Sequence, residues 1–202
     1  MSATILTEQQ QKVLELLAPI VEEKKFYLAG GTALAIQLHH RRSIDFDFFT
    51  DQSFNPSLLL AQLPPSNVLQ EAAGTLTVLL DGVKVSFFSF PYPLLSVLKK
   101  SEKISLADIT DIAAMKISAI AGRGSRKDFI DLFCIATMKY SLAECLTMFE
   151  KKFSAHTTDR YHLLRSVTYF ADAEEEVMPE MLIEFDWERT KTFFIEEVKK
   201  LQ

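Results

Sequence analysis

The chain has little of the residues on which several protein classes depend. Its 202 residues include two cysteines and four histidines. Cys134 and Cys145 follow no metal-ligand spacing, and the histidines form no zinc motif. We therefore interpret the cysteines as reduced thiols and expect no zinc centre.

Long apolar runs and a surplus of basic residues are also missing. No stretch is long enough to span a bilayer, and Met1–Gln11 lacks the features of a secretory signal, so we expect a cytoplasmic protein without a membrane partner. The formal net charge of −5 argues against a general nucleic-acid-coating protein. Two basic clusters, 99–103 and 123–127, are candidates for guiding an RNA end, although a charge run is more often a solvated face.

The residues that are present favour a globular α+β protein. With 48% hydrophobic residues, a chain of this length can bury a sizeable core. We predict an α/β core over residues 1–100 and a helical portion over 101–202 that packs on it. The expected strands cover 26–29, 44–50, 75–80 and 83–90, and the expected helices cover 7–24, 33–38, 55–63, 106–121, 127–138, 141–152, 158–171 and 187–201.

Gly30-Gly31-Thr32 connects the strand predicted at Phe26–Ala29 to an apolar helix. Thr32 is a good N-cap for that helix. A helix N-terminus presents free N–H groups and a partial positive charge, which suit a phosphate. A glycine pair that serves only a tight strand-to-helix turn is an equally good interpretation.

Asp45 and Asp47 stand at alternate positions of an apolar strand and must point the same way. Two anions on one poorly solvated face repel each other unless a cation lies between them. Mg²⁺ is the natural candidate, because it is usually held by one or two carboxylates plus substrate phosphates. The alternative is a solvated edge-strand face with Arg41 and Arg42 as neighbours. Together with the glycine pair, the carboxylates predict a metal–triphosphate site.

Two later segments also carry candidate residues. Lys116 lies near the apolar stripe of a helix whose start is predicted by a capping-box pattern at 105–108, and a lysine there must snorkel or meet an anion. Asp128 and Asp131 lie one turn apart at the start of the next helix, where a purely structural role is credible. Asp131 is expected to support Asp128 or to pair with Arg126 or Lys127.

Three ordered motifs give the chain a family resemblance. Residues 28–49, 111–116 and 126–132 resemble, in order and approximate spacing, the AbiEii/AbiGii-type nucleotidyltransferase toxins of the DNA polymerase β-like nucleotidyltransferase superfamily. The closing helix after Asp186-Trp187 is similar to the family's usual C-terminal end. The resemblance implies a nucleotidyltransferase-like mixed β-sheet with flanking helices and a mainly helical C-terminal portion.

The resemblance also implies an activity, in which a nucleoside monophosphate moves from a nucleoside triphosphate (NTP) to an acceptor hydroxyl with Mg²⁺ as cofactor. Asp45 and Asp47 are then the metal ligands, and the helical portion contributes the catalytic residues Lys116 and Asp128. The residues expected to bind the nucleotide are Gly30, Gly31, Thr32, Arg42, Ser43, Lys116 and Arg126. The implied biological role is the toxin of a toxin–antitoxin or phage-defence pair, with tRNA as the acceptor and a cognate antitoxin as partner.

Ser86 departs from the pattern of the superfamily. Its enzymes generally bring a third carboxylate from a later strand, and the related strand here, 83–88, carries Ser86 instead. A hydroxyl is a poorer magnesium ligand and no useful base at neutral pH. Two hypotheses stay open: an active enzyme with two metal carboxylates, or a catalytically silent member that binds a nucleotide or a partner protein.

Overall fold

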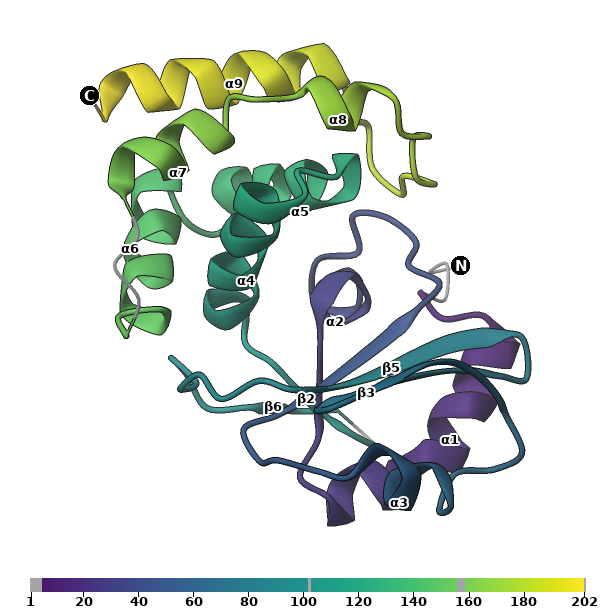
Figure 1. Cartoon of the computed structure of the whole chain (residues 1–202). Helices are drawn as coiled ribbons and strands as arrows, with labels where there is room; N and C mark the ends of the chain where they lie inside the picture. Colours follow the sequence, from purple (N-terminus) through teal and green to yellow (C-terminus); the bar gives the residue numbers. More distant parts are fainter. Residues whose placement is uncertain (1–4, 102, 156–158, 202) are drawn as a thin grey trace. The chain divides into compact units, whose positions relative to one another are not determined.

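A computed structural model describes residues 5–101, 103–155 and 159–201 (Figure 1). The chain divides into two compact units, each built from more than one segment. Unit 1 comprises Met1–Gln37, Arg42–Pro93 and Val97–Asp108, and unit 2 comprises Leu38–Arg41, Leu94–Ser96 and Ile109–Gln202.

Unit 1 is built on a mixed β-sheet, as predicted. The strands found in the described residues are β1 (Tyr27–Ala29), β2 (Phe46–Thr50), β3 (Asn67–Ala72), β4 (Thr75–Leu80), β5 (Val83–Ser89), β6 (Lys99–Lys100) and β7 (Ser105–Leu106). They follow the order β3-β4-β5-β2-β1-β7-β6 across the sheet. The β2–β5 and β1–β7 pairs are parallel and the remaining pairs are antiparallel.

Helices cover both faces of this sheet. Helices α1 (Glu8–Glu23) and α3 (Pro56–Leu60) lie on one face, and α2 (Gly30–Leu38) lies on the other (Figure 1). Thr7 caps α1 in a reciprocal capping box with Gln10. The sheet core is aromatic: Phe48 and Phe87 stack with ring centroids 5.5 Å apart, and both are fully buried.

Unit 2 is helical, which confirms the predicted character of the C-terminal portion. Its helices in the described residues are α4 (Ile109–Gly122), α5 (Arg126–Met138), α6 (Leu142–Lys152), α7 (Arg160–Ser166), α8 (Ala171–Glu174) and α9 (Trp187–Lys200). Phe129 of α5 contacts Trp187 and Phe194 of α9 edge to face, which joins these two helices. Taken singly, no described helix has the length and apolar character to cross a membrane; α5 and α6 meet those criteria only as a pair bent by 115°.

Several local predictions were wrong. The segment 105–108 does not start a helix: Ser105 and Leu106 form β7, Leu106 pairs with Leu28 of β1, and α4 begins only at Ile109. The helix expected over 158–171 ends early, because α7 stops at Ser166 and α8 begins only at Ala171; Thr158 lies outside the described residues. Strands β3, β6 and β7 were not expected. Pairing with neighbouring strands decided these segments, and local sequence patterns do not report that pairing.

Candidate functional site

The turn between β1 and α2 brings the two halves of the first motif together. Gly30 begins α2 directly after Ala29, with φ at +65°, a backbone conformation that favours glycine. Ala29 lies opposite Asp47 in the β1–β2 register. A Cβ added to Gly30 would lie 3.0 Å from Asp47 Oδ2, so the Asp47 carboxylate rests against the glycine backbone.

Thr32 is buried. It is not the N-cap that the sequence predicted, because α2 begins at Gly30. The hydroxyl of Thr32 lies 2.8 Å from the Ser43 hydroxyl and donates to the carbonyl oxygen of Asp45. The side-chain amide of Gln10 donates to the Ser43 carbonyl at 2.8 Å. The Thr32 contacts hold the segment that precedes β2 against the first turn of α2, and the Gln10 contact holds it against α1.

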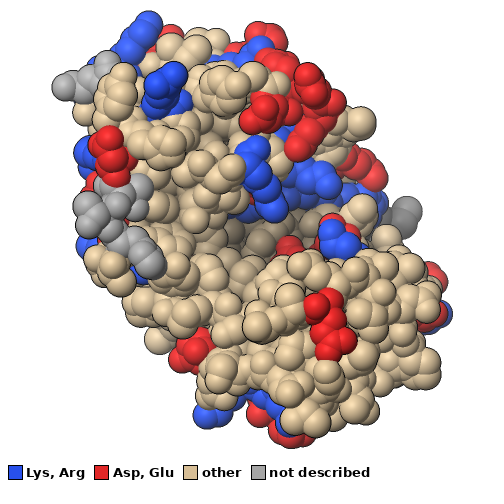
Figure 2. Space-filling view, viewed as in Figure 1, with Lys and Arg blue, Asp and Glu red and all other residues tan. Residues whose placement is uncertain are grey.

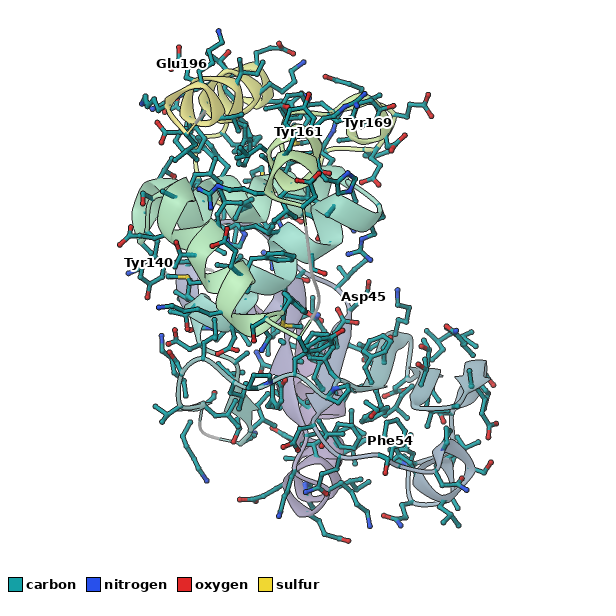
Figure 3. All side chains as sticks on the ribbon, turned by 60° about the vertical axis from the view of Figure 1, so that its left-hand side comes forward. Asp45, Phe54, Tyr140, Tyr161, Tyr169 and Glu196 are labelled. Atoms are coloured by element: carbon teal, nitrogen blue, oxygen red, sulfur yellow. The ribbon has the colours of Figure 1, made fainter. Side chains whose placement is uncertain are left out.

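Asp45 and Asp47 share one face of the sheet. Along β2 the burial alternates: Phe46 and Phe48 are fully buried, whereas Asp45, just before the strand, and Asp47 are half-buried. This alternation is the one expected of a strand with one face on the core. Asp45 lies in unit 1, as does Phe54, which follows β2 (Figure 3).

Strand β5 supplies the polar neighbours of this pair. Because β2 and β5 run parallel with Phe46 opposite Val85 and Asp47 opposite Ser86, Lys84 reaches Asp45. Lys84 Nζ lies 3.3 Å from Asp45 Oδ2, and sequence reasoning missed this ion pair. Ser86 is 3% exposed, and its hydroxyl lies 3.3 Å from that of Thr77. The position beside Asp47 therefore carries a hydroxyl where a third carboxylate was expected.

The donors on this face fit a magnesium ion held jointly with a nucleotide. Two half-buried carboxylates, one of them against a close-approach glycine, match a metal bound by one or two carboxylates plus phosphates. Across the described parts of the chain, no three His, Cys, Asp or Glu side chains are placed to hold a metal ion by themselves. A cation at Asp45 and Asp47 would therefore need phosphate and water as its remaining ligands.

In unit 2, Lys116 belongs to a buried network of charges. Its Nζ lies 2.8 Å from Asp128 Oδ1 and 2.6 Å from Asp131 Oδ2. Arg41 donates to both oxygens of Asp131, at 2.7 and 2.8 Å, and His40 Nε2 lies 2.8 Å from Asp131 Oδ1. The predicted pairing of Asp131 with Arg126 or Lys127 was wrong, because Asp131 lies on the side of α5 that faces α4 and the 38–41 segment.

The network fixes the ionisation of its members. Burial disfavours the charged form of Asp128, but the charge of Lys116 and the hydrogen bonds from Arg123 outweigh it and lower the pKa of Asp128 to about 2. Burial also opposes the charge of Asp131, yet Lys116 and Arg41 hold its pKa well below the ordinary value. The pKa of Lys116 is raised, since the two carboxylates outweigh its burial.

Asp128 is also held at the start of α5. The hydroxyl of Ser125, the N-cap residue, donates to Asp128 Oδ2 at 2.7 Å, and Arg123 Nε donates to the same oxygen at 2.9 Å. The Arg123 side chain is 70% exposed. A carboxylate with a pKa near 2 is a poor proton acceptor at neutral pH, so Asp128 is suited to orienting groups and not to removing protons.

Arg126 is engaged inside unit 2. Its guanidinium donates to the carbonyl oxygens of Ala173 at 2.7 Å and Glu174 at 2.9 Å, and it lies 5.1 Å from the centre of the Trp187 ring. These contacts engage part of the guanidinium that the sequence interpretation assigned to a nucleotide. Arg42, the other predicted arginine, is half-buried in unit 1.

Asp111 is the first residue of the second motif, but the sequence alone gave it no role. Asp111 and Lys152 form a fully buried ion pair at 2.6 Å. Asp111 also accepts hydrogen bonds from the backbone N–H groups of Leu95 and Ser96, at 3.0 and 3.2 Å. The pair joins α4, α6 and the 94–96 segment within unit 2, and no spacing pattern connects residues 111 and 152.

Comparison with solved structures identifies the fold. A Helicobacter pylori crystal structure aligns over 97% of this chain and 96% of its own, with a TM-score of 0.58 and 17% identity. MenT4, a nucleotidyltransferase toxin from Mycobacterium tuberculosis, aligns over 93% of this chain and 80% of its own, with a TM-score of 0.56 and 13% identity. The fold is that of nucleotidyltransferases, and the Asp47 carboxylate lies beside its glycine turn.

The sequence comparisons identify the family. The family model of the nucleotidyl transferase AbiEii toxin, from type IV toxin–antitoxin systems, matches residues 13–85 and 77–201. The uncharacterized protein aq_aa25 of Aquifex aeolicus (strain VF5) is 40% identical over 203 residues, which cover 96% of this chain and 97% of that protein. The chain belongs to the AbiEii family of nucleotidyltransferases, as the three motifs predicted.

Proposed function

We propose that the chain transfers a nucleoside monophosphate from an NTP to an acceptor hydroxyl in a Mg²⁺-dependent reaction at unit 1. The observation that carries this proposal is the placement of Asp47 against Gly30, with Asp45 on the same half-buried face. In the reaction the acceptor oxygen forms a bond to the α-phosphorus, the bond from that phosphorus to the bridging oxygen breaks, and pyrophosphate leaves. The hydroxyl proton passes to solvent.

Each residue of unit 1 has a defined part in this proposal. Asp45 and Asp47 would hold Mg²⁺, which would neutralise phosphate charge and align the reacting groups. The backbone of Gly30 and Gly31 lets phosphate approach the N-terminus of α2. Thr32 and Ser43 act by fixing the Asp45 backbone, because their hydroxyls are already bonded within the motif.

Four further residues remain proposals from the family resemblance. Arg42, Lys116 and Arg126 are assigned to phosphate, and Asp128 to the orientation of a reactant. Lys116 and Arg126 already donate to partners in unit 2, so phosphate would compete with these partners for them. The low pKa of Asp128, about 2, supports its assigned role, because Lys116 and Arg123 keep the carboxylate ionised.

We further propose that the protein acts as a toxin, with tRNA as the acceptor and a cognate antitoxin as partner. The family description as a type IV toxin supports the role, and the name of MenT4 supports it in a related fold. The formal net charge is −5, and the face in Figure 2 has large uncharged areas and, over the described residues, no continuous basic surface. Recognition of an RNA acceptor would therefore be local and limited to its end.

Label transfer tests the proposal. The purified protein is incubated with total tRNA and each of the four NTPs, radiolabelled at the α-phosphate, with Mg²⁺ or with EDTA. We expect label on the RNA only with Mg²⁺, and loss of that label in Asp47→Asn. Asp51→Asn, which removes an exposed carboxylate just after β2, is the matched control and should retain full transfer.

Ser86 supports a second candidate, the catalytically silent member. It is buried beside Asp47 at the place of the expected third carboxylate, and it offers no charge to a second metal ion. A silent protein would bind an NTP with Mg²⁺ and transfer no label from any of the four NTPs. Equilibrium dialysis of the same labelled nucleotides separates this outcome from a protein that binds none.

A further inference from the structure

Lys84 lies on this sheet face. Neither the motifs nor the proposed reaction gives it a role. It belongs to β5, between the buried residues Val83 and Val85, and its own side chain is 45% exposed. Its Nζ lies 3.3 Å from Asp45 Oδ2, and the Asp45 side chain is 33% exposed. Register alone places Lys84 there, because β2 and β5 run parallel and pair from Phe46 and Val85 onward.

The ion pairs on this face would rearrange when a metal–nucleotide complex binds. Before binding, Lys84 offsets part of the repulsion between Asp45 and Asp47. A divalent cation at the two carboxylates is a stronger partner for Asp45 than an exposed ammonium group, whose ion pair in water is weak. The triphosphate then brings more negative charge than one Mg²⁺ neutralises, and a half-exposed lysine on a flexible stem can turn toward it.

We propose that Lys84 is a phosphate-binding residue of this site, which pairs with Asp45 before a cation binds and transfers to the triphosphate when the cation takes Asp45. This inference rests on the proposed function, since it requires a metal at Asp45 and Asp47. It adds a binding residue from β5, the strand on which the expected third carboxylate is missing.

Metal binding without nucleotide tests the first half. Mn²⁺ is titrated into the whole protein, and free Mn²⁺ is followed by electron paramagnetic resonance. Lys84→Met should bind Mn²⁺ about three- to fivefold more tightly than the wild type, because the competing cation of Asp45 is removed. Lys84→Arg keeps the charge and should stay within about twofold of the wild type. Lys100→Met removes an exposed lysine at the far end of the same sheet and should change nothing.

Nucleotide binding tests the second half. With saturating Mn²⁺, the four α,β-methylene NTP analogues are titrated into the same variants by calorimetry. Lys84→Met should lose about tenfold in affinity for the analogue that binds best, as expected for one charge-assisted phosphate contact. Lys84→Arg should retain most of that affinity. Thermal unfolding of all variants should agree closely, which would separate a binding role from a structural one.

The outcomes distinguish this inference from the proposed function. If the wild type binds Mn²⁺ and nucleotide but Lys84→Met matches it in both titrations, the Lys84 inference is overturned alone. If Lys84→Met binds Mn²⁺ more tightly but keeps its nucleotide affinity, Lys84 only neutralises Asp45 and the phosphate role is overturned. If the wild type binds neither Mn²⁺ nor any analogue, the proposed function fails together with the inference.

Discussion

In unit 1, Asp45 and Asp47 stand on a half-exposed sheet face, whereas in unit 2 Asp111, Asp128 and Asp131 are buried among cations. The buried carboxylates link helices and segments, since each has charged partners within 3 Å, and Asp128 is the one of them that also has a proposed role in the reaction. The half-exposed pair can exchange partners with ions and ligands from solvent. Strong burial and pairing therefore mark Asp111 and Asp131 as aspartates that hold the fold together, whereas the acids proposed for metal binding are the more accessible ones.

Asp47→Asn gives the largest expected effect and tests the unit 1 side of this comparison. Loss of one metal carboxylate should lower label transfer by about 1,000-fold or more, because the charge that holds the cation is halved. Since the side chain is half-exposed, the free energy of unfolding measured in urea should change by less than about 1 kcal/mol. Transfer within tenfold of the wild type would contradict the metal-ligand assignment.

Asp131→Asn should instead have its large effect on stability. Arg41 and Lys116 would lose a shared carboxylate inside unit 2, and the free energy of unfolding should fall by about 3–5 kcal/mol, as when one partner of a buried ion pair is removed. Asp45→Asn is the matched control and should cost less than about 1 kcal/mol in the same urea titration. A small loss of unfolding free energy for Asp131→Asn would contradict the difference described between the buried aspartates of unit 2 and the half-exposed pair of unit 1.

Acid should weaken unit 2 through Asp128. Its pKa in the folded protein is about 2, below the ordinary value of 3.8, so its stabilising contribution is complete above about pH 4 and is lost as the pH falls toward 2. The difference corresponds to about 2 kcal/mol of unfolding free energy. Urea titrations from pH 5 to pH 2 should show a smaller slope for Asp128→Asn, and an identical slope would contradict the pairing described above.

Gly30→Ala and Gly82→Ala give a smaller loss of stability than Asp131→Asn and the sharpest contrast within unit 1. Both glycines have positive φ, at 65° and 79°, so each substitution should cost about 1–2 kcal/mol of unfolding free energy. Only Gly30→Ala places a Cβ 3.0 Å from Asp47 Oδ2, while nothing lies within 4 Å of the Cβ at position 82. Label transfer should therefore fall in Gly30→Ala alone, and equal transfer by the two variants would count against the glycine cradle.

The local half of the candidate site could be predicted from the sequence. The alternation that leaves Asp45 and Asp47 on one face is a property of any strand with apolar residues at Phe46 and Phe48. A glycine turn between a short strand and a helix can likewise be predicted from neighbouring residues. The hairpin at Asp81-Gly82, with both residues at positive φ between β4 and β5, follows from a local turn signal of the same kind.

The long-range half could not be predicted. The Arg41–Asp131 contact joins residues 90 positions apart, and Lys152–Asp111 joins residues 41 apart. Such pairs depend on the packing of elements, which no local period records. The capping-box pattern at 105–108 failed for the related reason that Leu106 gains more by pairing with Leu28 of β1 than a short helix start would supply.

The most direct measurement of the metal claim is a crystal structure with Mn²⁺ and an α,β-methylene NTP, in which anomalous scattering locates the ion. The account predicts an anomalous peak within about 2.5 Å of carboxylate oxygens of both Asp45 and Asp47, with phosphate oxygens completing its coordination. A peak bound elsewhere, or a nucleotide seated in unit 1 with no ion at these two carboxylates, would contradict it.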